Sequence, residues 1–175
     1  MHRGFDDDPI LGPAYAYWRD KCGVRPMPRR RDIDPTEIPQ LLPHLLITEL
    51  VDGGARLRYR LAGTAVVAAY GGELTGKNCD EVCPPERRAS ILANYRLICE
   101  RRRPLLLRHR YLSSRGAPLV CHRLVMPLSD DGDAVTQFVA ALRFEFTGKA
   151  HEWTGHWADA AGDFTFDRGY STIVA

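Results

Sequence analysis

Five largely apolar stretches of the chain are predicted to be β-strands, and in the second of them Leu57, Tyr59 and Leu61 alternate with Arg56, Arg58 and Arg60. The first two are joined by Asp52-Gly53-Gly54, a sequence typical of a β-hairpin turn. The last three are separated by turns rich in Ser, Gly, Asp and Pro. The pattern therefore predicts five strands, at residues 45–51, 55–61, 105–112, 119–128 and 134–146.

Helical periodicity occurs before and between these strands. Residues 14–22 place Tyr15, Trp18 and Cys22 along one face, and Gly23 ends this helix. A longer helix is predicted from about residue 85 to residue 103, and shorter helical pieces fall within residues 62–76. The predicted order in the main domain is therefore β-β-α-β-β-β.

Composition and charge exclude several classes of protein. The chain has 175 residues, 45% hydrophobic and 26% charged, which is typical of one globular domain. A net charge of +2 does not indicate a nucleic-acid-binding protein, so we expect no DNA partner. No apolar run approaches the roughly 20 residues that span a bilayer, and acidic residues 6–8 are unlike a secretory signal. We therefore expect a cytoplasmic protein without a membrane partner.

The five cysteines are odd in number and contain no C-x-x-C pair, which favours reduced thiols over disulfides or a structural zinc site. We accordingly predict no metal site. Cys79 and Cys83, four residues apart, are open to two interpretations: a redox or metal pair, or two small core residues, the interpretation that we favour.

Five sequence segments resemble, in the same order, a bacterial family of short, stand-alone PAS domain proteins. They are Tyr17-Trp18-Arg19, Pro28-Arg29-Arg30-Arg31-Asp32-Ile33-Asp34-Pro35, Ile38-Pro39-Gln40-Leu41-Leu42-Pro43, Arg58-Tyr59-Arg60-Leu61-Ala62-Gly63-Thr64 and Leu74-Thr75-Gly76-Lys77. The resemblance covers about residues 15 to 146. It implies an α+β fold with a five-stranded antiparallel sheet, strand order 2-1-5-4-3, helices over one face and a pocket between them.

This resemblance divides the chain into three parts. An N-terminal helical extension occupies residues 1–43, the PAS domain core occupies residues 44–146, and an aromatic C-terminal tail occupies residues 147–175. The tail lies outside the resemblance, and its aromatic residues lead us to expect that it packs against another surface. PAS domains sense small molecules or mediate protein contacts, and they commonly dimerise.

A candidate ligand site follows from pairing the hairpin symmetrically about residues 113–118. That register places His109 opposite His122 on the apolar, pocket-facing side of the sheet. The histidines are either core residues bonded to the backbone, which we favour, or ligands of a carboxylate, a metal or a haem. The predicted pocket face comprises Tyr59, His109, Tyr111, His122, Leu124, Met126, Phe138 and Leu142.

Candidate partner-binding residues form two groups. Tyr15 and Trp18 of the N-terminal helix are expected to contact a second copy in a homodimer. The other group is a row of arginines on the opposite sheet face. This row is either a solvated surface paired with Glu49 and Glu145, or a docking surface for an acidic partner or a nucleotide messenger. We favour the paired surface. These arginines are Arg56, Arg58, Arg60, Arg108, Arg110, Arg123 and Arg143.

Cofactor chemistry has weaker support. Gly76-Lys77-Asn78-Cys79 looks like the photoactive-cysteine motif of flavin-binding PAS domains, but Asp80 and Cys83 stand where that motif has Arg and Gln, and Leu142 where a later Gln is expected. The long helix lacks the histidine that haem-binding PAS domains use. Neither flavin nor haem is therefore favoured, and the cofactor is left open.

No nucleophile, base and acid occur in a recognisable catalytic pattern, so no catalytic residue is predicted. The leading hypothesis is a non-enzymatic sensor that binds a small, apolar or weakly acidic molecule and signals to a protein partner. The alternative is a ligand-free dimerisation or scaffold module.

Overall fold

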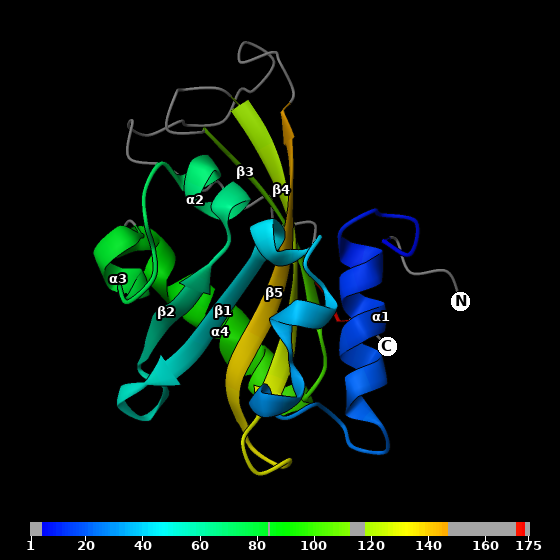
Figure 1. The fold of residues 1–175 in the computed structure, drawn as a ribbon. Helices are drawn as coiled ribbons and strands as arrows, with labels where there is room; N and C mark the ends of the chain where they lie inside the picture. Colours follow the sequence, from blue (N-terminus) through cyan, green and yellow to red (C-terminus); the bar gives the residue numbers. More distant parts are fainter. Residues whose placement is uncertain (1–4, 84, 113–117, 147–170, 174–175) are drawn as a thin grey trace.

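A computed structural model of the protein describes residues 5–83, 85–112, 118–146 and 171–173. Six strands form one antiparallel sheet in the order β2-β1-β5-β4-β3-β6 (Figure 1). The first five have the predicted order 2-1-5-4-3, and their ends agree with the predicted ends to within one residue. The strands are β1 (Leu45–Val51), β2 (Arg56–Ala62), β3 (Leu105–Leu112), β4 (Pro118–Ser129), β5 (Val135–Phe146) and β6 (Ser171–Ile173).

Helices lie on both faces of this sheet (Figure 1). α2 (Thr64–Tyr70), α3 (Cys79–Val82) and α4 (Pro85–Arg101) pack on one side, which we call the inner face. α1 (Leu11–Cys22) packs on the other side, which we call the outer face. Short 3-10 turns complete the chain at Arg30–Asp32, Pro35–Glu37, Leu42–His44 and Asp52–Gly54.

α1 begins at a capped turn and buries one side against the sheet. The Asp8 carboxylate accepts the backbone N–H groups of Ile10 and Leu11, each at 2.9 Å, which satisfies donors that the first turn leaves unpaired. Tyr15 and Trp18 follow at helical spacing and are buried, 7% and 5% exposed. The prediction that these two aromatic residues contact a second copy does not agree with this burial, because the sheet of their own chain covers them.

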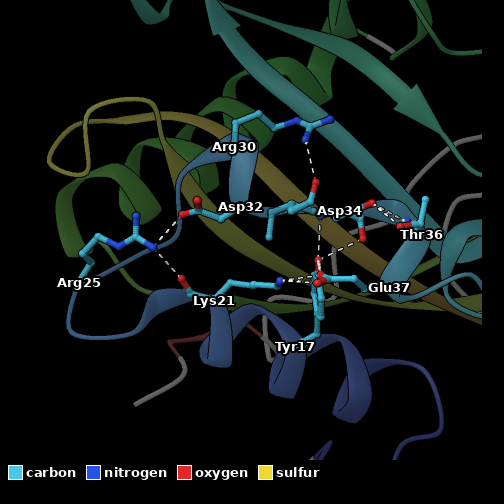
Figure 2. A network of polar contacts seen from close by, with 9 residues as sticks. Tyr17, Lys21, Arg25, Arg30, Asp32, Asp34, Thr36 and Glu37 are labelled. Carbon is cyan, nitrogen blue, oxygen red and sulfur yellow. Dashed lines mark hydrogen bonds and ion pairs between the residues drawn. The ribbon is translucent and has the colours of Figure 1, made fainter.

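A polar network holds the segment after α1 against the helix (Figure 2). The Tyr17 hydroxyl donates to the Glu37 carboxylate at 2.6 Å and accepts the backbone N–H of Asp34 at 2.8 Å. Lys21 pairs with the same carboxylate at 2.6 Å, and the Asp34 side chain accepts the N–H of Thr36 at 2.9 Å. Two of the segments that carry the family resemblance thus join α1 to the 3-10 turns.

The β3–β4 hairpin has a different register from the predicted one. β4 begins at Pro118, which pairs with Leu112, so that His109 pairs with Cys121 and His122 pairs with Arg108. A one-residue shift moves every side chain of a strand to the other face. The predicted pairing of the two histidines is therefore wrong.

The shift divides the predicted pocket face between the two sides of the sheet. Tyr59, Phe138 and Leu142 pack in the inner-face core. Leu124 and Met126 pack in the outer-face core under α1, so their assignment to the pocket face is wrong. β4 is apolar on both faces from Leu124 to Met126, which is why the alternation did not fix its orientation.

At the other edge of the sheet, the end of the C-terminal tail adds a strand. β6 pairs antiparallel with β3, joining Ile173 to Leu105 and Ser171 to Leu107. The tail was expected to pack on another surface, and its described part does so as a sixth strand. The tail aromatics Trp153, Trp157, Phe164, Phe166 and Tyr170 lie outside the described residues.

Candidate functional site

Most arginines of the predicted cationic row have acidic partners on the outer face or at the β2 edge. Glu49 lies 3.9 Å from Arg58 and 3.6 Å from Arg60. Arg143 contacts Asp8 and lies 3.4 Å from Glu145. Arg56 donates to Asp80 at 3.1 and 2.8 Å, and Arg108 also has an interaction partner. The side chain of Arg110 lies outside the described part. These pairs agree with the interpretation of a paired surface.

Arg123 does not belong to this row, and its assignment to the outer face is wrong. The register pairs it with Leu107 and Leu142, both in the inner-face core. Its side chain is 8% exposed and donates to the hydroxyl of Tyr70 from α2. Its Nε has no hydrogen-bond partner, and no carboxylate within the described residues forms an ion pair with it. The inner face therefore contains a buried cation without an acidic partner in the described part.

Two cysteines lie beside this cation. In the one-turn helix α3, the N–H of Cys83 donates to the carbonyl of Cys79 at 2.8 Å, which places the two side chains on one side of the turn. The thiol of Cys79 donates to Cys83 Sγ at 3.1 Å, and the Tyr59 hydroxyl lies 3.8 Å from the same sulfur. Both cysteines are buried, 5% and 6% exposed.

The loop before α3 fixes the cysteines against Tyr59. The backbone N–H of Tyr59 donates to the carbonyl of Lys77 at 2.9 Å, and the N–H of Gly76 donates to the carbonyl of Tyr59 at 2.8 Å. Gly76 has φ of +84°, a left-handed conformation that favours glycine. The Leu74-Thr75-Gly76-Lys77 segment thus works as a local extension of the sheet that positions α3.

Hydrogen bonding and nearby charge separate the titration of the two thiols. The S–H of Cys79 lowers the pKa of Cys83 to about 7; burial opposes this, while Tyr59, Arg123 and Arg88 favour the thiolate. The pKa of Cys79 is raised, first because it donates to Cys83 and second because it is buried. Burial likewise raises the pKa values of Tyr59 and Tyr70. Of the two thiols, ionisation is therefore favoured at Cys83.

Together these side chains form the inner-face polar cluster, defined as Tyr59, Tyr70, Cys79, Cys83 and Arg123. A pocket of about 200 Å³ lies next to it, and Cys79 belongs to both. Leu57 and Leu92 contribute apolar walls. The pocket is lined by Ala55, Arg56, Leu57, Cys79, Asp80, Arg88 and Leu92.

The chemistry of this cluster suits an anion or an oxidant rather than a metal. No group of three or more His, Cys, Asp or Glu side chains within the described residues could hold a metal ion. Flavin also does not fit the predicted motif positions, because Cys79 faces Cys83 and the Asp80 carboxylate is bound by Arg56. A guanidinium with two phenols nearby, by contrast, matches the donors that bind a carboxylate.

His122 lies outside this cluster. On the outer face it is 3.4 Å from Glu145 Oε2. Its pKa is lowered, mainly by burial and then by Arg143 and Arg108, although Glu145 acts in the opposite direction. The side chains of His109 and Tyr111 lie outside the described part of the chain. Because the strand register pairs His122 with Arg108 and His109 with Cys121, the structure does not form the predicted histidine pair.

Comparison with known proteins decides the family. A sequence model described as a PAS domain matches residues 9–143, which is more than half of the chain. The chain belongs to the PAS domain family. The match includes α1 of this PAS domain and the five strands of the core up to Arg143 in β5.

Solved structures of light-oxygen-voltage (LOV) domains are similar to this PAS domain in fold. A LOV protein from Rhodobacter sphaeroides is 15% identical, with a TM-score of 0.47, over 69% of this chain and 72% of that chain. The LOV domain of the blue-light photoreceptor Aureochrome1 is 13% identical, with a TM-score of 0.46, over 64% and 88%. A mutant of Vivid is 14% identical, with a TM-score of 0.48, over 74% and 98%. Comparison with curated proteins gives no match.

The cluster of this PAS domain was only partly visible in the sequence. Tyr59 was predicted on the correct face, whereas Arg123 was misplaced and Tyr70 was not considered. The signal for Arg123 is its spacing from Leu119 and Cys121, four and two residues earlier, which puts all three on one face of β4. No helix among the described residues is long and apolar enough to cross a membrane.

Proposed function

We propose that this PAS domain is a non-enzymatic sensor whose inner-face polar cluster binds a small molecule with an anionic group, a carboxylate in the simplest case. The observation that carries the proposal is the buried guanidinium of Arg123 without an acidic partner in the described part. A buried charge is costly unless it is paired and hydrogen-bonded. A ligand carboxylate would provide both, because it accepts two parallel N–H bonds from a guanidinium.

The surroundings of Arg123 favour a ligand that is otherwise apolar. Phe138 and Leu142 of the inner-face core are fully buried, and Tyr95 packs edge-on against Phe138 with ring centroids 4.7 Å apart. The phenols of Tyr59 and Tyr70 add polar groups on the same side. A weakly acidic molecule with a small hydrocarbon body matches this mixture.

A route to a signalling partner runs through β4. Arg123 lies on the inner face of this strand, and Leu124 packs on its outer face in the same core as α1. Trp18 of α1 donates to the carbonyl of Pro127, further along β4. A ligand that shifts β4 would therefore change the position of α1, and with it the surface that a partner protein meets.

Native mass spectrometry and thermal denaturation test whether the protein binds such a ligand. Gently purified wild-type protein is expected to carry a defined extra mass, or to gain thermal stability from short mono- and dicarboxylates but not from the matching carboxamides. Arg123→Met should abolish both effects. Arg60→Gln, which removes an exposed arginine of the opposite face, should leave them intact.

A ligand-free dimerisation or scaffold module is the second candidate. It is favoured by the size of the pocket beside the inner-face polar cluster, about 200 Å³, which is below the roughly 300 Å³ at which ligand pockets usually begin. Protein of the bare sequence mass, a dimer in native mass spectrometry and no response to any carboxylate would establish this function and reject the sensor.

A further inference from the structure

The thiols of Cys79 and Cys83 form a pair that ligand binding does not require. Their sulfur atoms are 3.1 Å apart, closer than two cysteines that merely fill a core need to be. No third metal-ligating side chain joins them within the described residues. Within the described residues the contact is therefore that of a dithiol with no further metal ligand beside it.

Three features prepare Cys83 for reaction. Cys79 donates its S–H to Cys83 Sγ, and the Tyr59 hydroxyl lies 3.8 Å from the same sulfur. Arg123 from β4 and Arg88 from α4 provide positive charge. One carboxylate of α3, Asp80, is paired with Arg56. A thiolate, which is the reactive form of cysteine, is favoured at Cys83.

We propose that Cys79 and Cys83 are a reversible dithiol–disulfide switch that is oxidised by hydrogen peroxide. The Cys83 thiolate attacks one peroxide oxygen, the O–O bond breaks, and hydroxide leaves, so that Cys83 becomes a sulfenic acid. Cys79 then attacks the sulfenic sulfur, the S–O bond breaks, and water leaves with the proton of Cys79. Overall, two thiols and one peroxide give one disulfide and two waters.

The backbone permits this bond. Four residues of helix separate the α-carbons by about 6 Å, within the range of roughly 4.4–6.8 Å found across disulfides. Cys83 lies just after the end of α3 with extended backbone angles, φ of −102° and ψ of 140°, so its side chain is not confined by the helix. The Sγ atoms need to approach from 3.1 Å to about 2.0 Å, a movement that side-chain rotation provides.

The pocket beside Cys79 brings a small oxidant to one member of the pair, whose sulfur lies 3.1 Å from Cys83 Sγ. Its volume of about 200 Å³ holds hydrogen peroxide, and Cys79 is one of its walls. Bulky reagents have no comparable path, because both cysteines are almost fully buried. The switch is therefore expected to respond to peroxide faster than to a large disulfide.

Peptide mapping of the whole reduced protein tests the switch. After a titration with hydrogen peroxide, free thiols are alkylated and the chain is cut after Glu81, which separates the two cysteines. We expect the two fragments to remain linked and to lose the mass of two hydrogen atoms. Cys83 should be oxidised about tenfold faster at neutral pH than Cys99, which is partly exposed and lacks a donor thiol.

Two variants identify the order of the steps. Cys79→Ser should stop at the sulfenic acid of Cys83, which dimedone traps, and Cys83→Ser should give neither product at the same peroxide dose. Cys121→Ser, which removes a buried thiol outside the pair, should leave the disulfide unchanged. Two results in the wild-type protein would overturn the proposal, whatever the variants do. One is oxidation of Cys99 before the pair; the other is that Cys79 and Cys83 are alkylated as fully after peroxide treatment as before it. The switch does not depend on the proposed ligand, so failure to find a stabilising carboxylate would leave this result unaffected.

Discussion

The indole N–H of Trp18 donates a hydrogen bond to the carbonyl oxygen of Pro127 at 2.9 Å, joining residues 109 positions apart. This bond and the apolar contacts around it attach α1 to β4. The helix is therefore part of the folded core of the PAS domain, and the family match, which begins at residue 9, agrees with this.

Substitution of Trp18 is expected to lower the stability of the fold rather than to change its oligomeric state. Trp18→Phe should cost about 1–2 kcal/mol, because it leaves the Pro127 carbonyl unpaired. Trp18→Ala should cost about 3–5 kcal/mol, since it also leaves a cavity. Urea denaturation measures both values, and a stable monomeric Trp18→Ala protein would show that the residue is a dimer contact after all.

Gly63→Ala should destabilise the fold by about 3 kcal/mol, in the upper range for single substitutions. A Cβ at this position would lie 2.2 Å from the Leu42 carbonyl oxygen and 2.4 Å from that of Pro43, and backbone cannot move aside easily. Gly72→Ala is the matched control, because its Cβ would meet open space. Equal unfolding midpoints for the two variants in urea would contradict the close approach at Gly63.

Because Arg123 and Tyr70 are in contact, the effects of substituting each of them on the free energy of unfolding should not add. Tyr70→Phe alone should destabilise by about 1–2 kcal/mol, because it removes the described hydrogen bond of a buried guanidinium. Adding Arg123→Met should restore or exceed wild-type stability, since an apolar side chain often replaces a buried charge without loss. A double variant less stable than Tyr70→Phe would show that the guanidinium is paired inside the protein.

Alkylation of Cys83 should follow the ionisation of its thiol. Because its pKa is lowered to about 7, the rate with iodoacetamide should rise through a midpoint near pH 7. In Cys79→Ala the donor is lost and the midpoint should move up, toward the ordinary cysteine value of about 8.5. Peptide-resolved alkylation rates between pH 5 and pH 10 give both midpoints; identical midpoints would exclude the S–H donor as the cause.

Acid should destabilise the fold partly through His122. Its pKa is lower in the folded protein than in the unfolded chain, so the unfolded chain binds the proton first as pH falls below about 6.5. The contribution of His122 to stability is therefore complete above that pH and is lost below it. His122→Gln should show a smaller loss of unfolding free energy between pH 7 and pH 5; an unchanged slope would assign the acid sensitivity to other groups.

The sequence predicted the strands well and the site only in part. Strand ends depend on local signals such as Asp52-Gly53-Gly54, and these were sufficient. The site depends on which way β4 faces, and its run Leu124-Val125-Met126 is apolar on both sides because α1 covers the outer face. Only the tertiary packing of Trp18 and the strand pairing of Pro118 decide that orientation. The 3.1 Å approach of Cys79 and Cys83 likewise depends on side-chain placement that spacing alone leaves open.

The position of α1 also sets the order in which the chain acquires structure as it leaves the ribosome. The apolar face of this first helix packs against Met126 of β4 and Val139 of β5, which are synthesised more than a hundred residues later. Contacts between such distant segments form slowly, because the intervening chain must first be ordered. Tyr15 and Trp18 are therefore exposed until β4 and β5 have been synthesised, and a chaperone that binds apolar helices would contact this segment before the sheet covers it.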